Sequence, residues 1–503
     1  DYRSQVFLNG IEAGVPHEGA FTGFSYDVTD LVKDGANDLM VRVWDPTEGF
    51  VNPLGKQSTT PKGCFYTRMS GIWQTVWMET VPEKYIRGYK VETDIDNSTV
   101  KFDFDIAGKG DVAVQIHGVL QSSESGESGE VVVKIPDAKL WAPEEANLYE
   151  FSAKYGEDEI RGYFGMRKFE KRKDAKGVLR FFLNNRPYFV LGTLDQGWWP
   201  DGLLTPPSDE AMAHDIRTLK NCGFNAMRKH IKVEPMRYYH LCDRMGILVL
   251  QDLPCASGDM HGPMGLENVF NYGFHRLELK RMMDGLRNVP SIVMWIPYNE
   301  SWGQPGRFLT HATLDWVKAY DPSRLVNGPS GWNDYEGGVF RADYKVWKLC
   351  ASEHLPADVC EAADVIDRHD YAKKPKVFPA NDRRISFLGE FGGINLKVKD
   401  HLWDAKGHFG YEQRESAEEL QKAYVEILNH VGTLVPGGLS GFSWTDASGK
   451  TVWISSPTAW QIRAELKVPL KESGIKTNFF MVSLAYRKRE RVSPPPFVVW
   501  LTC

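Results

Sequence analysis

The chain has 503 residues, of which 42% are hydrophobic and 25% are charged, and its formal net charge is −6. This length exceeds one ordinary hydrophobic core and predicts two to four domains, while the composition is that of a globular protein and excludes extensive disorder. The mild negative charge gives no support for nucleic-acid binding, and no run of 18 apolar residues predicts a membrane span. We therefore expect neither a nucleic acid nor a membrane as a partner.

The first 172 residues predict two β-domains. In residues 1–82, short runs of β-branched and aromatic residues are separated by Gly, Asn and Asp at the spacing of an antiparallel sandwich. Residue 1 directly precedes a strand-like stretch, so we expect this domain to begin upstream, and localisation stays undecided. Residues 83–172 repeat the pattern and predict a second β-sandwich, in which the polar segment QSSESGESGE at 121–130 is an expected exposed loop.

From residue 173 to residue 463, apolar strand-like runs alternate with amphipathic helix-length segments, which indicates βα units and a parallel sheet. Ser208 is an expected N-cap for a helix over 208–222, and further helices are expected at 272–288, 309–320 and 415–430. Eight strands over this length favour a (β/α)8 barrel over an open sheet. The expected strands are 188–194, 224–228, 247–252, 292–298, 324–327, 364–369, 386–390 and 439–444.

Residues 464–503 do not continue the barrel pattern. The preceding segment, 446–463, shows no clear amphipathic helix, and the final stretch SPPPFVVWLTC looks foreign to the fold. We therefore treat 464–503 as an atypical C-terminal tail.

Polar and aromatic residues gather at the ends of the predicted barrel strands. In a (β/α)8 barrel, the carboxyl ends of the strands build the active site. Each such residue taken alone is more often a structural hydrogen-bonding group, but six strands deliver one to the same rim. These residues are Arg228, Lys229 and His230, Gln251 and Asp252, Asn299 and Glu300, His369, Asp370 and Tyr371, Glu390, and Trp444.

Two carboxylates, Glu300 and Glu390, follow strands on opposite sides of the predicted barrel mouth. Paired carboxylates across a cleft suit glycoside hydrolysis, in which one group donates a proton to the leaving oxygen and the other, ionised, faces the anomeric carbon. We expect Trp295 and Trp302 to disfavour ionisation of Glu300, and Arg228 to keep Glu390 ionised.

These motifs resemble glycoside hydrolase family 2, which contains β-galactosidases, β-glucuronidases and β-mannosidases. The resemblance rests on NESWG at 299–303, FLGEFGG at 387–393, VFLNGIEAG and SGIWQTVWMETV near the N-terminus, and LWAPEEANLY in the second β-domain. It implies a partial β jelly roll that binds sugar, an immunoglobulin-like β-sandwich and a catalytic (β/α)8 TIM barrel, in that order.

The resemblance also implies roles for individual residues. Glu300 matches the family's acid/base and Glu390 its nucleophile, in a retaining mechanism with the carboxyl groups about 5 Å apart. Arg228 matches the arginine that holds the nucleophile, and Asn299 matches the amide that binds the sugar 2-hydroxyl. His369 and Tyr371 match substrate-contacting positions of the family, and Trp444 matches the aromatic residue that forms the floor of the sugar subsite. His230 is a further candidate substrate contact because it follows the second barrel strand.

The loop DQGWWPDG at 195–202 follows the first barrel strand, where a substrate wall would stand. Its Asp195, Trp198 and Trp199 are candidate sugar contacts, and packing of the loop against the β-domains is an equal alternative. Lys229 and Lys232 are interpreted as solvated lysines. The stretch LPCASGDMHG lacks the acid and His ligands of metal-dependent relatives, so we expect no metal and no cofactor.

The leading hypothesis is a retaining exo-β-glycosidase, with a β-galactoside as the preferred substrate. The alternatives are a catalytically impaired carbohydrate-binding protein, a β-mannosidase- or β-glucuronidase-type enzyme, and an endo-acting glycoside hydrolase. A carbohydrate is the expected partner, and a homo-oligomer is compatible with the family resemblance.

Overall fold

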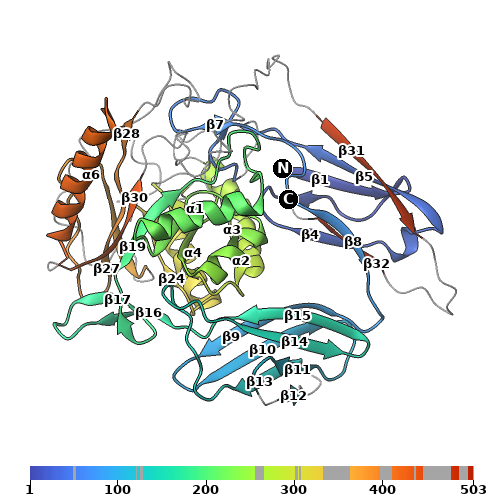
Figure 1. The fold of residues 1–503 in the computed structure, drawn as a ribbon. Coiled ribbons are helices and arrows are strands. Elements are labelled where there is room, and N and C mark those ends of the chain that lie inside the picture. The colour runs from blue at the N-terminus through green and yellow to red at the C-terminus, as the bar shows by residue number, and fades with distance from the viewer. Residues whose placement is uncertain are drawn as a thin grey trace.

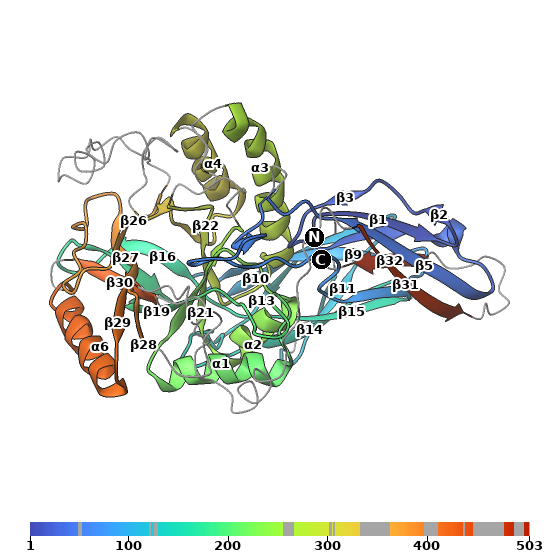
Figure 2. The ribbon, with the colours of Figure 1, turned by 90° about the horizontal axis from the view of Figure 1, so that it is seen from above.

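The computed structural model describes residues 1–48, 53–119, 122–124, 129–254, 266–300, 304, 307–331, 363–396, 411–435, 438–445, 477–486 and 497–501. A barrel with helices around it lies at the centre, an N-terminal β-domain lies against one side of it, and a second β-domain lies beneath it (Figure 1). In both views the N-terminal domain and helix α6 are on opposite sides of the barrel (Figure 2). Within the described residues, no helix is both long enough and apolar enough to cross a membrane.

The N-terminal domain consists of two antiparallel sheets that enclose a core of alternate strand residues such as Val6, Leu8, Val41 and Val43. This alternation is the pattern of a sheet with one buried face. The elements that residues 1–82 contribute are β1 (Arg3–Leu8), β2 (Ile11–Glu12), β3 (His17–Glu18), β4 (Phe24–Asp27), η1 (Thr29–Leu31), β5 (Gly35–Trp44), β6 (Gln57–Ser58), β7 (Tyr66–Thr67) and β8 (Val76–Thr80).

Two strands from the C-terminal tail complete these sheets. β31 (Thr477–Tyr486) pairs antiparallel with β5 along all ten of its residues. β32 (Phe497–Leu501) lies between β4 and β8 and pairs with both. The expectation that the tail is foreign to the fold is therefore wrong for these segments, because their partners lie in the N-terminal domain and not in the barrel.

The second β-domain packs the sheet β13-β10-β9 against the sheet β12-β11-β14-β15. Its strands are β9 (Ile86–Asp94), β10 (Thr99–Ile106), β11 (Ala113–Ile116), β12 (Ser122–Glu124), β13 (Glu130–Lys134), β14 (Tyr149–Tyr155) and β15 (Asp158–Phe164). β12 falls inside the segment 121–130 that we expected to be a loop. Its three polar residues form an edge strand because they pair with β11, a tertiary contact that local composition does not reveal.

The barrel sheet has eight parallel strands in the order β24-β22-β21-β20-β19-β30-β27-β26, and a bridge between Asn327 and Val365 joins its two ends. The eight strands expected from the sequence are confirmed, and the fifth is only two residues long. They are β19 (Val190–Asp195), β20 (Ala226–Lys229), β21 (Leu248–Asp252), β22 (Ile292–Ile296), β24 (Leu325–Val326), β26 (Val365–Asp370), β27 (Ile385–Gly392) and β30 (Leu439–Thr445).

Helices cover the outside of this sheet. Ser208 caps α1 as expected by accepting a hydrogen bond from the amide of Ala211, and Ser416 caps α6 in the same way. The helix α2, opened by Pro235, was not predicted. The helices are α1 (Asp209–Asn221), α2 (Met236–Met245), α3 (Leu266–Leu286), α4 (Arg307–Tyr320) and α6 (Ala417–Gly432).

A hairpin before the first barrel strand closes one end of the barrel. Phe169 and Phe181 pack in one cluster with the barrel residues Val293 and Phe387, and the rings of Phe181 and Phe387 meet edge to face. This end is therefore a packed core, and polar side chains are left to the opposite rim. The hairpin strands are β16 (Phe169–Lys173), β17 (Leu179–Leu183) and β18 (Arg186–Pro187), and the short strands at the other rim are β23 (Tyr298–Asn299), β25 (Pro329–Ser330), β28 (Ile394–Leu396) and β29 (Glu412–Arg414).

Candidate active site

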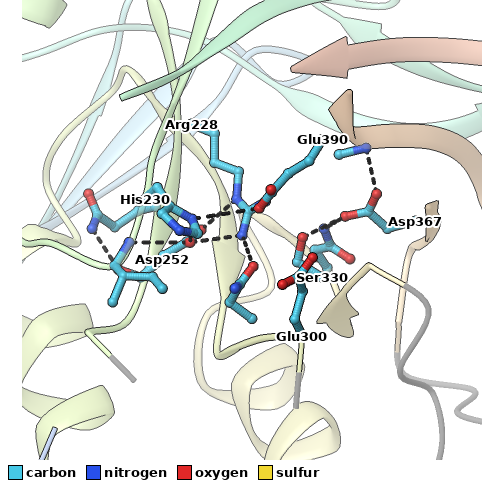
Figure 3. A network of polar contacts seen from close by, with 12 residues as sticks. Arg228, His230, Asp252, Glu300, Ser330, Asp367 and Glu390 are labelled. Atoms are coloured by element: carbon cyan, nitrogen blue, oxygen red, sulfur yellow. Dashed lines mark hydrogen bonds and ion pairs between the residues drawn. The ribbon is translucent and has the colours of Figure 1, made fainter. Parts of the chain in front are cut away.

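Arg228 is the centre of a buried polar network at the carboxyl ends of the barrel strands (Figure 3). Its Nε and Nη2 donate to the two oxygens of Asp252 at 3.0 and 2.9 Å. Its Nη1 donates to Glu390 Oε1 at 3.0 Å, and its Nη2 also donates to Asn299 Oδ1 at 2.9 Å. One guanidinium thus joins four strands, and its planar fork suits this arrangement better than a lysine ammonium would. We call Arg228, Asp252, Asn299, His369 and Glu390 the Arg228 cluster.

Glu390 is held as a carboxylate. Burial favours its neutral form, but the charges of His369 and Arg228 outweigh burial and lower the pKa of Glu390 to about 2. The hydroxyl of Tyr371 donates to Glu390 Oε2, and the Tyr371 ring stacks on Tyr411 with 3.8 Å between centroids. The nucleophile predicted from the sequence therefore lies in a setting that keeps it ionised at neutral pH.

Glu300 lies at the end of β23 with a backbone φ of 45°, a region that non-glycine residues rarely adopt. Its amide donates to the carbonyl of Ser330 at 3.0 Å, which holds this conformation. A strained backbone of this kind costs about 1–3 kcal/mol and persists where surrounding contacts enforce it, often at functional sites. The side chain of Glu300 is 20% exposed, so it borders solvent at the barrel mouth.

His369 lies between the two predicted catalytic carboxylates. Its Nδ1 is 2.6 Å from Glu300 Oε1 and 3.6 Å from Glu390 Oε1. Burial alone would lower the pKa of His369, but Glu390 and Glu300 outweigh burial and raise it. Oxygens of Glu300 and Glu390 lie within 4.8 Å of each other, a separation that brings both carboxylates to one small volume.

His230 lies behind Glu390, with its Nδ1 3.9 Å from Glu390 Oε1 and 3.1 Å from Asp252 Oδ2. Burial, together with the charges of Lys56 and Arg228, lowers the pKa of His230 well below its ordinary value. His230 is thus a neutral imidazole at neutral pH. The structure brings it into the same site as the other candidates from strands two, four, six and seven.

A second buried network begins at Lys229, directly beside Arg228 in sequence. Lys229 Nζ donates to Asp195 Oδ2 and to Glu234 Oε1, both at 2.8 Å. Lys232 Nζ is 3.0 Å from Glu234 Oε2, and Tyr238 donates to the same oxygen of Asp195 at 2.8 Å. We call Lys229, Lys232, Asp195, Glu234 and Tyr238 the Lys229 cluster.

The interpretation of Lys229 and Lys232 as solvated lysines is wrong, because both side chains are fully buried. The carboxylates of Asp195 and Glu234 supply the opposite charge that such burial requires. Asp195, a predicted sugar contact, has 26% of its side chain exposed but uses its carboxylate to hold Lys229, Tyr238 and the amide of Gly197. Its contact with a sugar stays a prediction.

The loop after β19 packs on the N-terminal domain. Trp199 is buried in one cluster with Phe21 and Trp73, and Trp198 stacks on Tyr66 with 4.5 Å between ring centroids. The structure thus gives Trp199 a packing role, which was the alternative to sugar binding, and we do not carry its sugar contact forward.

Two other expectations about tryptophans change. Trp295 does not lie beside Glu300, because its Nε1 donates to Asp321 at 2.9 Å among the residues that face the helices. Its predicted effect on Glu300 is therefore withdrawn, and Trp302 lies outside the described residues. For Trp444, only the backbone is described, in β30 opposite Thr193 of β19. The role of Trp444 as the floor of the sugar subsite stays a prediction.

Glu300, His369 and Glu390 also form a group with three potential metal-ligand atoms within 4.8 Å of one another. The Arg228 guanidinium already lies on Glu390 Oε1, and it supplies the positive charge that a cation would bring. The observed hydrogen bonds account for the arrangement. The stretch LPCASGDMHG, on which the expectation of no metal rested, lies mostly outside the described residues.

Three residues of this site were not identified as site residues from the sequence. Asp252 was noted at the end of its strand but given no role, although it holds two edges of the Arg228 guanidinium. Ser330 and Asp367 link His369 to the backbone of the barrel. A signal existed for Asp367, which stands two residues before His369 on a strand and so shares its face.

The comparisons with known proteins agree with this architecture. Residues 84–167 match the family described as glycosyl hydrolases family 2, and residues 202–355 match the TIM barrel domain of glycosyl hydrolases family 2. Both matches are to domains of glycoside hydrolase family 2, and they support the resemblance to this family. The fold of the chain is multidomain, with β-sandwich domains and a (β/α)8 barrel.

Among curated relatives, a putative beta-glucuronidase of Formosa agariphila is 25% identical over 391 residues, which are 68% of this chain and 44% of that protein. A beta-galactosidase of Lactococcus lactis is 26% identical over 394 residues, 71% of this chain and 37% of that protein. The chain thus spans less than half the length of these relatives. A beta-D-glucuronidase structure from Dictyoglomus thermophilum shares the fold, with a TM-score of 0.66, 16% identity, and coverage of 92% of this chain and 85% of that one.

Proposed function

We propose that this protein hydrolyses terminal β-linked glycosides with net retention, with Glu390 as the nucleophile and Glu300 as the acid/base. The observation that carries the proposal is the placement of two carboxylates within 4.8 Å of each other at the mouth of a family 2 barrel. Retaining glycosidases hold their carboxyl groups about 5–5.5 Å apart, whereas inverting enzymes leave a wider gap for a water molecule. The environments of the two groups also differ, because Glu390 is buried between Arg228 and Tyr371 while Glu300 is partly exposed beside His369.

In the first step, a Glu390 oxygen attacks the anomeric carbon and the bond from that carbon to the leaving oxygen breaks. Glu300 gives its proton to the leaving oxygen, and a glycosyl ester with Glu390 remains. Arg228 and Tyr371 prepare Glu390 for attack because they hold its two oxygens in place. The positive charge that develops on the sugar faces this ionised group.

In the second step, Glu300 is ionised and removes a proton from a water molecule, whose oxygen attacks the anomeric carbon. The ester bond breaks, and Glu390 leaves as a carboxylate. The exposed edge of Glu300 gives water access to it, while Glu390 stays buried. Arg228 holds the Asn299 oxygen, so the amide nitrogen points away from the guanidinium, where it can donate to a sugar hydroxyl.

For the sugar itself, we propose a β-galactoside as the first candidate. Some relatives are named beta-glucuronidases. A glucuronide carries a carboxylate, and binding this group needs a cation in the site. Lys229 and Lys232, the lysines of the RKHIK segment, are committed to Asp195 and Glu234 and do not offer one. This commitment favours a neutral sugar.

The test is a hydrolysis screen of the purified chain with aryl β-galactoside, β-glucuronide, β-mannoside and β-glucoside. We expect turnover of one sugar, a loss of at least about 10⁴-fold in kcat for Glu390→Gln, and the β-anomer as the first product in an NMR time course. Glu426→Gln, on the exposed face of α6, is the control and should keep full activity.

Near-normal rates for Glu390→Gln or Glu300→Gln would overturn the catalytic assignment, and an α-anomer as first product would overturn retention. Sugar binding by folded protein without hydrolysis would favour the carbohydrate-binding alternative. Cleavage of internal polysaccharide bonds without action on aryl monosaccharides would identify an endo-acting enzyme.

A further inference from the structure

A chain of hydrogen bonds runs from the Glu300 carboxylate to the backbone directly before Glu390, and Figure 3 shows its Ser330 and Asp367 members. It runs from Glu300 to His369 Nδ1, from His369 Nε2 to Ser330 Oγ at 2.9 Å, and from Ser330 Oγ to Asp367 Oδ2 at 2.8 Å. The other Asp367 oxygen accepts from the amide of Gly389 at 2.6 Å, and Gly389 directly precedes Glu390 in sequence. Asp367 therefore contacts both the hydrogen-bond chain that reaches Glu300 and the backbone that precedes Glu390.

The backbone around Gly389 is shaped for this contact. The register between β26 and β27 shifts so that Arg368 lies opposite Leu388 and His369 opposite Glu390, which leaves Gly389 without an opposite residue. A bulge of this kind redirects the next side chain and frees an amide, here bound by Asp367. A Cβ at residue 389 would lie 2.2 Å from the Asp367 carboxylate, so glycine is required for the approach.

Asp367 also fixes the far side of the barrel rim. Its Oδ2 accepts from Asn327 Nδ2 at 2.7 Å as well as from Ser330, and both of these residues follow β24. The carbonyl of Ser330 in turn accepts from the strained amide of Glu300. The buried Asp367 side chain thus supports the backbone on both sides of the predicted catalytic pair.

The direction of these hydrogen bonds sets the tautomer of His369. Ser330 has one hydroxyl proton, and when it donates that proton to Asp367, its oxygen can accept from His369 Nε2–H. Arg228 Nη1, which only donates, lies farther from the same Nε2, at 3.5 Å against 2.9 Å for Ser330, so we assign the Nε2 proton to the shorter contact. Nδ1 of a neutral His369 is then unprotonated toward Glu300. A protonated Glu300 can donate to it, and a protonated His369 can donate back to an ionised Glu300.

We propose that Asp367 is a positioning residue that acts through Ser330 and His369 to let Glu300 alternate between acid and base, while it fixes the bulge that aims Glu390. The proposal rests on the proposed glycosidase function. A cation on His369 in one half of the cycle and a neutral ring in the other would match the two charge states of Glu300.

The electrostatic surroundings of His369 agree with this role, since Glu390 and Glu300 raise its pKa against the effect of burial. Burial in turn raises the pKa of Asp367, opposed by the charges of His369 and Arg228. The charged or titratable groups that face His369 from its neighbours are Glu300, Glu390, Arg228, His230, Asp252 and Asp367.

The test compares Asp367→Asn with wild type on two substrates, an alkyl glycoside with a poor leaving group and a dinitrophenyl glycoside with a good one. A carboxamide at 367 donates to Ser330, so Ser330 can donate to Nε2, and His369 then carries its proton on Nδ1 and holds Glu300 ionised. We expect kcat/KM to fall on the order of 10²-fold for the alkyl glycoside and less than about 10-fold for the dinitrophenyl glycoside. The alkaline limb of the pH profile should move to lower pH.

A purely structural role would lower both rates by one factor and leave the pH profile unchanged, and that result would overturn the proposal. Asp321→Asn is the matched control, because Asp321 is another mostly buried acid whose partners, Trp295 and Arg324, lie outside the site. If Asp367→Asn does not fold, Ser330→Ala carries the test. It should show the same preference for the good leaving group, and equal losses would overturn the proposal.

The tautomer is measured directly on the full chain with ¹⁵N-labelled histidine, using His369→Gln to assign the ring signal. We expect the Nε2–H form for neutral His369 in wild type and the Nδ1–H form in Asp367→Asn. Identical ring shifts in the two proteins would overturn the proposal. This readout needs no turnover, so it separates failure of the positioning role from failure of the proposed glycosidase function.

Discussion

Arg228 and Lys229 are neighbours in sequence, yet they lead two buried charge clusters of opposite character. The Arg228 cluster reaches the barrel mouth, where its His369 contacts the partly exposed Glu300. In the Lys229 cluster, both lysines and Glu234 are buried, and only Asp195 has part of its side chain exposed. Lys232 of this cluster donates to the carbonyls of Gly197 and Leu204 in the loop after β19. The Arg228 cluster thus holds the predicted reactive groups, and the Lys229 cluster holds a loop.

Strand geometry explains the division. Successive side chains of a strand point to opposite faces, so Arg228 and Lys229 cannot share partners on one face. The register places Arg228 opposite Leu250, two residues before Asp252, and it places Lys229 opposite Asp195. Two basic residues that are adjacent in sequence therefore have different roles, because their side chains point to opposite faces of the strand. The number of buried charges at a barrel rim does not by itself tell how many of them take part in catalysis.

Among variants that distinguish the Arg228 cluster from the Lys229 cluster, Lys229→Met is expected to have the largest effect, a loss of stability. The change leaves Asp195 and Glu234 with less opposite charge in a buried setting, which typically costs about 3–5 kcal/mol of the free energy of unfolding. Urea denaturation measures the loss, and kcat of the folded fraction should stay within a few-fold of wild type. Lys422→Met, on the exposed side of α6, is the control. A stability change below about 1 kcal/mol would contradict the structural role of the cluster.

The two clusters should also respond at opposite ends of the pH range. The pKa of Glu390 is lowered from 4.5 to about 2, because the charges of His369 and Arg228 outweigh burial, so its contribution to stability is present above pH 4.5 and is lost as the pH falls toward 2. Burial lowers the pKa of Lys232 from 10.5 to about 8 despite Glu234, so its contribution is full above pH 10.5 and is lost as the pH falls through 8.

Urea midpoints of wild type, Glu390→Gln and Lys232→Met across pH 3–10 measure both effects, each expected to be on the order of 1–3 kcal/mol. The difference between wild type and Glu390→Gln should change below pH 5, and the difference between wild type and Lys232→Met should change between pH 7 and 10. Parallel curves for all three proteins would contradict the assigned charge states.

Tyr371→Phe is expected to have the smallest effect of these variants, a modest loss of kcat. The variant removes the hydroxyl that donates to Glu390 but leaves Arg228 on the other oxygen. We expect kcat to fall about 10-fold with little change in the urea midpoint, which is the reverse of the Lys229→Met result. Tyr424→Phe, on α6, is the matched control. A loss of stability without a loss of kcat would show that Tyr371 supports the fold and does not prepare Glu390 for catalysis.

Much of the barrel could be predicted from the sequence because its signals are local. Parallel strands are buried on both faces, so each appears as an apolar run, and the residue that ends the run marks the rim. In this way IVMWIPYNE led to Glu300, FLGE to Glu390 and FNAMR to Arg228. The structure places all three at the same mouth.

What could not be predicted depends on contacts between distant segments. The charges of Lys229 and Lys232 indicate solvent until Asp195 and Glu234 are placed beside them. The role of Asp367 requires a bulge at Gly389 and the position of Ser330, neither of which leaves a local pattern. The polar strand β12 forms only because β11 offers it an edge.

The pairing of β31 and β32 with the N-terminal sheets has a consequence for biosynthesis. β5 leaves the ribosome about 430 residues before β31, so its pairing with β31 forms only after the second β-domain and the barrel have been synthesised. The second β-domain and the barrel draw on intervening residues and can fold earlier. Until the tail is made, β4, β5 and β8 lack the pairing that β31 and β32 provide, and unpaired strand edges favour pairing with other chains.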